Sequence, residues 1–149
     1  MRYEDLARLV DDRADGGEFS VHRDIFTDPA VYELEMRHIF EATWVFLGLA
    51  NQLPEPHDFL TTWIGRQPVV VMRDAQGRLG GFFNTCRHRG ALLCHTEQGN
   101  AKYHVCHYHG WAYDSGGKNI DVKDRKQGCY PESFNRQAHG LTPLARFGE

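Results

Sequence analysis

The stretch that decides the fold reads Asn-Thr-Cys-Arg-His-Arg-Gly over residues 84–90 and, after a spacer, Cys-His-Tyr-His-Gly-Trp over residues 106–111. Each part holds a cysteine and a histidine close together, followed by a glycine that lets the backbone turn back sharply. We call residues 86–90 the first knuckle and residues 106–110 the second knuckle. Together they offer two thiolates and two imidazoles, a set typical of metal sites, from Cys86, His88, Cys106 and His109.

The grouping of these four side chains separates the candidate metals. A zinc site with two cysteines and two histidines usually has both cysteines in one knuckle and both histidines in a helix. Here each knuckle pairs one cysteine with one histidine. That suits a binuclear iron–sulfur cluster in which one iron takes both thiolates and the other takes both imidazoles. The spacing therefore favours iron–sulfur and keeps zinc as the alternative.

Short extended segments surround the knuckles and predict a mainly β unit. They are rich in aromatic and β-branched residues, and the turn at residues 74–77 joins two of them as a hairpin. The expected strands are residues 44–49, 59–64, 69–73, 79–84, 102–105 and 111–113, with a further strand beginning in the apolar patch at 141–147.

The N-terminal part is expected to be helical. Residues 1–12 carry apolar side chains between charges, which predicts one short amphipathic helix, and residues 19–26 are expected to be extended. Asp28 and Pro29 predict the start of a second helix, with the aspartate as N-cap and the proline at the first helical position. This helix is expected to run to about Glu41.

The composition excludes several classes of partner. The 149 residues carry a net charge of −3, which gives no reason to expect nucleic acid or an anionic membrane. No apolar run approaches the roughly 18 residues of a membrane span, and the N-terminus lacks the apolar region of a secretory signal. A cytoplasmic location is therefore expected. In that compartment the four cysteines, Cys86, Cys94, Cys106 and Cys129, are expected to serve metal binding or packing and not disulfides.

The two knuckles resemble the signature of Rieske [2Fe-2S] proteins. The form with Arg-Gly after the first histidine and Tyr before the second resembles the large subunit of ring-hydroxylating oxygenases. Ala91 and Tyr108 stand where respiratory Rieske proteins have two more cysteines, joined in a disulfide, so the resemblance favours the oxygenases. His107 departs from the family, which usually has proline there, and we expect an exposed, harmless substitution.

The resemblance implies a mainly β, Rieske-type fold of small antiparallel sheets with an α-helical leader. The implied division is a leader at 1–43, a Rieske domain at 44–125, and a loop and strand start at 126–149 that lead to a further domain. Cys86 and Cys106 would ligate one iron of the [2Fe-2S] cluster, and His88 and His109 the other. Four neighbours are expected to shield the cluster or to dock a partner: Trp111, Arg87, Arg89 and Tyr108.

The function that the resemblance implies is electron transfer within an aromatic-ring-hydroxylating dioxygenase, an oxidoreductase of aromatic hydrocarbon catabolism. The family's mononuclear Fe(II) site has no ligand set in these 149 residues, so we expect no catalytic residue for hydroxylation here and a chain that is part of a longer subunit. Expected partners are a ferredoxin or a flavin/iron–sulfur reductase, and other large subunits in a homotrimer, with or without a small subunit.

The implied substrate class leans toward aromatic acids of the benzoate, salicylate or anthranilate type. Two other functions stay open from the sequence. One is a stand-alone Rieske-type ferredoxin, and the other is a structural module held by zinc.

Overall fold

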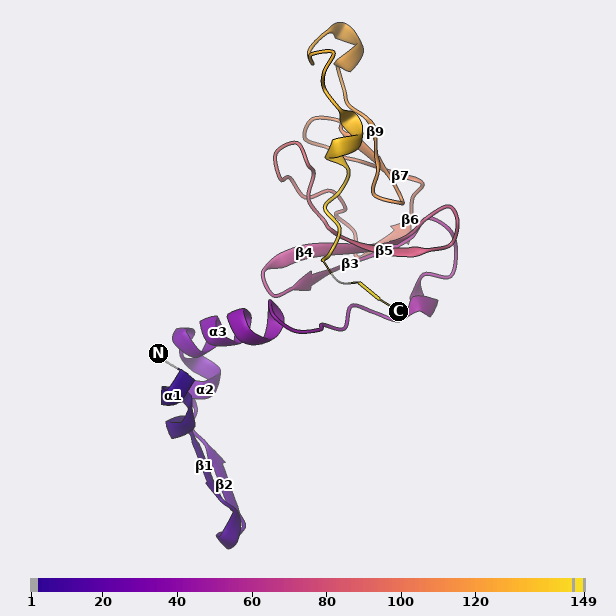
Figure 1. Ribbon diagram of the computed structural model, residues 1–149. Coiled ribbons are helices and arrows are strands. Elements are labelled where there is room, and N and C mark those ends of the chain that lie inside the picture. Colours follow the sequence, from indigo (N-terminus) through magenta and orange to yellow (C-terminus); the bar gives the residue numbers. More distant parts are fainter. Residues whose placement is uncertain (1–2, 146, 149) are drawn as a thin grey trace. The chain divides into compact units, whose positions relative to one another are not determined.

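The computed structural model describes residues 3–145 and 147–148 and is drawn in Figure 1. The chain divides into two compact units, Met1–Val45 and Phe46–Glu149. The first unit mixes short helices with a hairpin, and the second is built from antiparallel strands. Within the described residues, no helix has both the length and the apolar character that crossing a bilayer requires.

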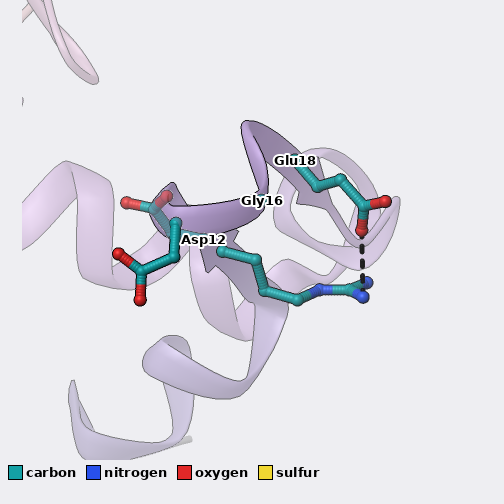
Figure 2. A pocket seen from close by; sticks show the side chains of 5 residues that line it. Asp12, Gly16 and Glu18 are labelled. Carbon is teal, nitrogen blue, oxygen red and sulfur yellow. Dashed lines mark ion pairs between the residues drawn. The ribbon is translucent and has the colours of Figure 1, made fainter.

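In the first unit, the helix predicted over residues 1–12 is wrong beyond its first turns, because the chain enters a hairpin. The observed elements are α1 (Tyr3–Leu6), a 3-10 turn (Ala7–Leu9), β1 (Val10–Arg13) and β2 (Glu18–Val21). Arg13 stands opposite Glu18 in the hairpin, and their side chains form an ion pair at 2.9 Å. Figure 2 shows this pair beside a hollow that is otherwise lined by acidic side chains and Gly16. Opposite charges across two strands stabilise the pairing, whereas an isolated helix this short is marginal.

The extended segment predicted over residues 19–26 ends at Val21 and gives way to α2 (Asp24–Thr27). α3 (Pro29–Glu35) then begins as predicted. The carboxylate of Asp28 accepts a hydrogen bond from the Ala30 N–H at 2.7 Å, and the proline occupies the first turn, where it needs no hydrogen-bond partner. A π-helical turn (Met36–Phe40) closes the helix near its predicted end.

The second unit holds two antiparallel sheets. The four-stranded sheet has the order β5-β4-β3-β6, and the three-stranded sheet has the order β7-β8-β9. The hairpin predicted around residues 74–77 is confirmed as β4 and β5, whereas β6 and β9 were not expected. The strands are β3 (Asp58–Ile64), β4 (Gln67–Arg73), β5 (Leu79–Phe83), β6 (Gln98–Asn100), β7 (Tyr103–Val105), β8 (Ala112–Asp114) and β9 (Asn119–Asp121).

The strand predicted over residues 44–49 is wrong. Its aromatic side chains suggested a sheet, but Trp44 and Phe46 are 71% and 78% exposed, and no described strand pairs with the segment. The backbone N–H of Leu49 donates instead to the side chain of Gln52 at 2.7 Å. This local bond caps a 3-10 turn (Ala50–Gln52), so the segment ends in a turn and does not join a ladder.

The strand predicted to start at residues 141–147 is also wrong for the residues of this range that the structure describes, 141–145 and 147, although the segment does lie against β5. The Phe83 N–H donates to the carbonyl oxygen of Thr142, and the Leu144 N–H donates to that of Gly81, each at 2.9 Å. Between these two bonds stands Pro143, which forms only an isolated bridge with Phe82. The pairing stays a single bridge. Both bonds to β5 come from the residues on either side of Pro143, so the missing proline N–H lies on the side that faces away from β5.

The core of the second unit brings both sheets and both knuckles together. Cys86 and Cys106 are 3% and 1% exposed, so the two knuckles are anchored in the apolar interior at their cysteines. The buried cluster consists of Phe59, Val70, Met72, Cys86, Leu93, Cys94, Cys106, Trp111, Tyr113, Val122 and Leu141. Residues 126–149 belong to this unit, and Tyr130 and Phe134 pack against the cluster.

Candidate metal centre

The two knuckles fold into the same hydrogen-bonded turn. In the first, the Gly90 N–H donates to the carbonyl oxygen of Cys86 at 2.9 Å, and in the second, the Gly110 N–H donates to that of Cys106 at 2.8 Å. Both glycines have positive φ, 73° and 70°, a region that residues with a Cβ adopt at a cost. Each knuckle therefore needs its glycine. Both turns place the cysteine four residues before the glycine, whereas the histidine follows the cysteine by two residues in the first knuckle and by three in the second.

The two knuckle thiols lie close together in the core. Burial raises the pKa of Cys86, and the neighbouring thiol of Cys106 raises it further. A hydrogen bond with Tyr113 acts in the opposite direction, because the phenol oxygen lies 3.3 Å from the Cys86 sulfur. Such thiols give up their protons readily only when a metal replaces them, which is the behaviour of a ligand pair in a buried metal site.

The two knuckle histidines face one another. The Nδ1 atoms of His88 and His109 are 3.1 Å apart, with the ring planes nearly perpendicular at 80°. Both side chains are partly exposed. Burial and the neighbouring His109 lower the pKa of His88, which favours the neutral imidazole that ligates metals. The same nitrogen of each ring thus points toward a common place.

The four side chains are arranged as two pairs. In the described part of the chain, no three Cys, His, Asp or Glu side chains surround a single point, as a mononuclear metal site would need. A Rieske cluster needs only two protein ligands at each iron, two thiolates at one and two imidazoles at the other. Two adjoining thiols and two converging imidazoles meet that requirement.

Aromatic side chains pack against one face of the His88 ring. The ring of Trp111, which is 2% exposed, stacks on the His88 ring at 4.9 Å with an interplanar angle of 16°. The indole N–H donates to the hydroxyl of Tyr130 at 3.1 Å, and Phe134 and His139 contact the indole edge-on. The segment after β9 therefore holds Trp111 against the histidine and covers one side of the site.

The other predicted neighbours lie on the exposed side of the knuckles. Arg87 and Arg89 are exposed, and the guanidinium of Arg89 lies 5.7 Å from the ring centre of Tyr108. Tyr108 is 60% exposed, and its ring lies 3.9 Å from that of His109. His107 is exposed, as predicted for the residue that replaces proline.

Tyr113 is a site residue that the sequence analysis did not single out. It is fully buried, and its hydroxyl contacts the Cys86 sulfur while accepting the Arg87 backbone N–H at 2.9 Å. A signal for it existed, because residues i and i+2 of a strand lie on the same face. In the strand predicted over residues 111–113, Tyr113 is two positions beyond Trp111 and would lie on the same face.

The remaining cysteines are not part of the centre. All four cysteines are free, Cys94 is buried, and Cys129 is exposed. Burial raises the pKa of Cys94 to about 12, so this thiol keeps its proton at neutral pH. This agrees with the expectation that the cysteines form no disulfides.

Comparison with known proteins decides which kind of centre this geometry represents. The family model of the Rieske [2Fe-2S] domain matches residues 43–135. The chain belongs to the Rieske [2Fe-2S] domain family. The predicted mainly β Rieske fold and its [2Fe-2S] cofactor are thereby confirmed, and the matched residues include both knuckles.

The relatives of this Rieske domain include dioxygenase subunits. The chain is 44% identical over 140 residues to toluate 1,2-dioxygenase subunit alpha of Pseudomonas putida, and 42% identical over 143 residues to 2-halobenzoate 1,2-dioxygenase large subunit of Burkholderia cepacia. These matches cover 93% and 95% of this chain but 31% of each relative. The predicted kinship with ring-hydroxylating dioxygenase large subunits is thus confirmed, over less than a third of their length.

A solved structure shows the same Rieske architecture. Naphthalene 1,2-dioxygenase from Rhodococcus sp., bound to indole, superposes with a TM-score of 0.80 at 32% sequence identity. The superposition covers 94% of this chain and 30% of that chain. The likeness therefore extends over nearly all of the present sequence and leaves most of the solved chain unmatched.

Proposed function

We propose that Cys86 and Cys106 hold one iron of the Rieske cluster, that His88 and His109 hold the other, and that the chain is the electron-carrying part of an aromatic-ring-hydroxylating dioxygenase large subunit. One observation carries this proposal. Two knuckles with the same turn bring a pair of buried thiols and a pair of facing Nδ1 atoms to one place, inside the segment that matches the Rieske family. The bound cluster supplies a centre that accepts and passes on one electron at a time.

The two sides of the site differ in the residues that surround the proposed ligands. Trp111 and the aromatic residues behind it exclude water from the side of His88. On the opposite side the histidines are partly exposed, so a ring N–H not used for ligation can donate to a carboxylate of a protein that receives the electron. Arg89 lies over the Tyr108 ring, which contacts His109, and the two side chains offer a cationic and aromatic surface for that contact or for the electron donor.

The proposed partners follow from this surface and from the relatives. A ferredoxin or a flavin/iron–sulfur reductase would deliver electrons, and the mononuclear iron of a neighbouring large subunit in a homotrimer would receive them. The chain spans under a third of the length of its dioxygenase relatives, and this supports the proposal that the iron site lies in a further domain.

The proposed substrate of the whole enzyme is an aromatic carboxylate. The toluate, 2-halobenzoate and anthranilate dioxygenases match 93%, 95% and 89% of this chain. Biphenyl and benzene dioxygenases, at 43% and 44% identity, match 83% and 66%. The longer matches to enzymes named for aromatic acids support the acid class. The proposal predicts that the full-length large subunit, with a reductase, consumes O₂ with benzoate-type acids and not with biphenyl or benzene. The reverse preference would contradict it.

The ligand set is tested by electron paramagnetic resonance of the anaerobically purified, reduced chain. We expect the rhombic Rieske signal and a reduction potential within about −150 to +300 mV, above the roughly −400 mV of all-cysteine ferredoxins. His88→Cys and His109→Ala should each abolish the Rieske signal, whereas His95→Ala, at an exposed histidine nearby, should keep it. A colourless wild-type protein that contains zinc would overturn the iron assignment and leave the structural module as the function.

A stand-alone ferredoxin is the other outcome that these measurements can separate. The isolated chain should take up one electron and should not hydroxylate any aromatic compound. The ferredoxin function would be favoured over the dioxygenase function if the complete natural protein ended at this domain and reduced a separate oxygenase.

A further inference from the structure

Hydrogen bonds connect the segment before the first knuckle to the strand before the second knuckle. Asn84 follows β5 and stands two residues before Cys86, while His104 lies in β7 and stands two residues before Cys106. Cys94, from the loop between the knuckles, contacts both of these residues. The two knuckles are therefore connected at equivalent positions.

These hydrogen bonds are directional. The Asn84 side-chain amide donates to the carbonyl oxygen of Cys94, and the Cys94 N–H donates back to the Asn84 side-chain oxygen, both at 2.8 Å. The Cys94 sulfur lies 3.2 Å from Nδ1 of His104. All three residues are buried, at 2%, 7% and 6% exposure. We call this set, Asn84, Cys94 and His104, the polar bridge.

At the position of His104, an apolar side chain would satisfy packing better than a histidine. The His104 ring contacts Phe59 edge-on at 5.1 Å, yet its Nε2 atom is buried with no hydrogen-bond partner among the described residues. An apolar ring would fill this space without leaving a buried polar atom unpaired, which costs free energy. Hydrogen bonds fix distance and direction in a way that apolar contact does not.

We propose that the polar bridge positions the two knuckles, holding Cys86 and Cys106 at the separation that the cluster requires. Cys94 and His104 are positioning residues in this account, because they act through the backbone that leads to each cysteine. The inference rests on the proposed ligand set. It adds that the lifetime of the cluster depends on residues that do not ligate it.

The first test compares two substitutions of Cys94 in the cluster-containing chain. Cys94→Ala removes the group that bonds to His104, whereas Cys94→Ser keeps a group that can form this bond. Bleaching of the visible absorption at a fixed temperature, well below unfolding, gives the rate of cluster loss. We expect Cys94→Ala to lose its cluster about fivefold faster than the wild type, the change typical of one lost hydrogen bond, with a broadened paramagnetic resonance signal. Cys94→Ser should stay within about twofold.

The second test separates positioning from packing. His104→Phe also breaks the bridge, but it removes the unpaired Nε2 atom from the core. We expect faster cluster loss together with an unchanged or higher melting temperature of the cluster-free chain. The double variant with Cys94→Ala should lose its cluster no faster than the faster single variant, because both changes break the same contact.

Three results would overturn the inference. They are wild-type cluster lifetimes in both single variants, effects that multiply independently in the double variant, or faster cluster loss that always accompanies a matching fall in melting temperature. If Cys94→Ala does not fold, Cys94→Val, which fills the space without the hydrogen bond, takes its place. A wild-type chain without a Rieske signal would instead refute the proposed ligand set, so the two failures are distinguishable.

Discussion

The hydroxyl oxygen of Tyr113 lies 3.3 Å from the sulfur of Cys86 in the buried core beneath the first knuckle. The same oxygen accepts a hydrogen bond from the backbone N–H of Arg87 at 2.9 Å. With one lone pair occupied in this way, the phenol proton is available to the sulfur. Burial raises the pKa of Tyr113, so the proton stays in place at neutral pH. The tyrosine is therefore a neutral donor to one of the proposed ligands.

Tyr113→Phe is expected to lower the reduction potential of the cluster by about 65–130 mV. A hydrogen bond to a ligand sulfur stabilises the more negative, reduced state. Bonds to charged groups are worth about 1.5–3 kcal/mol, and 59 mV corresponds to about 1.4 kcal/mol for one electron. A redox titration measures the change. Tyr103→Phe, at a tyrosine of β7 that is 53% exposed, should leave the potential where it is. Equal potentials in wild type and Tyr113→Phe would refute the donor role.

Gly90→Ala and Gly128→Ala form a matched pair. Both glycines have positive φ, 73° and 80°, and an added Cβ would meet no heavy atom within 4 Å at either site. Each substitution should lower the free energy of unfolding by about 1–2 kcal/mol, the cost of a left-handed conformation for a residue with a Cβ. Only Gly90→Ala should also speed cluster loss at temperatures well below unfolding, because only Gly90 shapes a knuckle. Equal cluster lifetimes would contradict the proposed role of that turn.

Tyr130→Phe is expected to destabilise the chain by about 1–3 kcal/mol, since it leaves the buried indole N–H of Trp111 without its acceptor. Urea unfolding of the cluster-free chain gives the value. Tyr103→Phe serves again as the control, because it removes a hydroxyl from an exposed side chain. Identical unfolding curves for the two variants would show that the Trp111–Tyr130 bond contributes nothing.

Because of Cys94, the free energy of unfolding of the cluster-free chain is expected to fall as the pH rises above 9. The pKa of this thiol is about 12 in the folded chain, against an ordinary value of 9.0, so its contribution to stability is complete below pH 9 and is lost as the pH rises toward 12. Between pH 8 and 10 the loss should be about 1.4 kcal/mol, since the unfolded chain releases a proton that the folded chain retains. Urea unfolding of Cys94→Ser, which has no thiol to titrate, should show a pH dependence smaller by that amount. Parallel curves for the two proteins would contradict the shift.

The parts of the fold that the sequence predicts correctly are the local ones. The cap formed by Asp28, the hairpin around residues 74–77 and the two knuckles each depend on a few adjacent residues with distinctive backbone preferences. The mixed grouping of cysteine and histidine was enough to indicate the iron–sulfur centre, because ligand spacing within a turn is also local. The side chains that surround the centre were only partly predicted.

Contacts that residue type and periodicity do not determine account for the wrong strand at residues 44–49 and for the polar bridge that was not predicted. Aromatic residues predicted a strand at residues 44–49, but a strand forms only beside another strand, and the Gln52 side chain takes the N–H of Leu49 instead. The polar bridge could not be predicted from the sequence for the same reason. Asn84 and Cys94 are separated by ten positions, as are Cys94 and His104, and no periodic pattern connects them.

The segment that follows residue 140 has a consequence for association between molecules. It occupies backbone groups of Phe83 and Gly81 along the outer edge of β5, which would otherwise be an open sheet edge. Open edges are templates on which a second chain can add a strand, and proline at an edge discourages such growth. Pro143 lies in this segment and has no N–H with which to extend the sheet. Residues 142–144 thus cover the edge of β5 and oppose the addition of a strand from another molecule. A chain shortened to residue 140 would be prone to aggregate through β5.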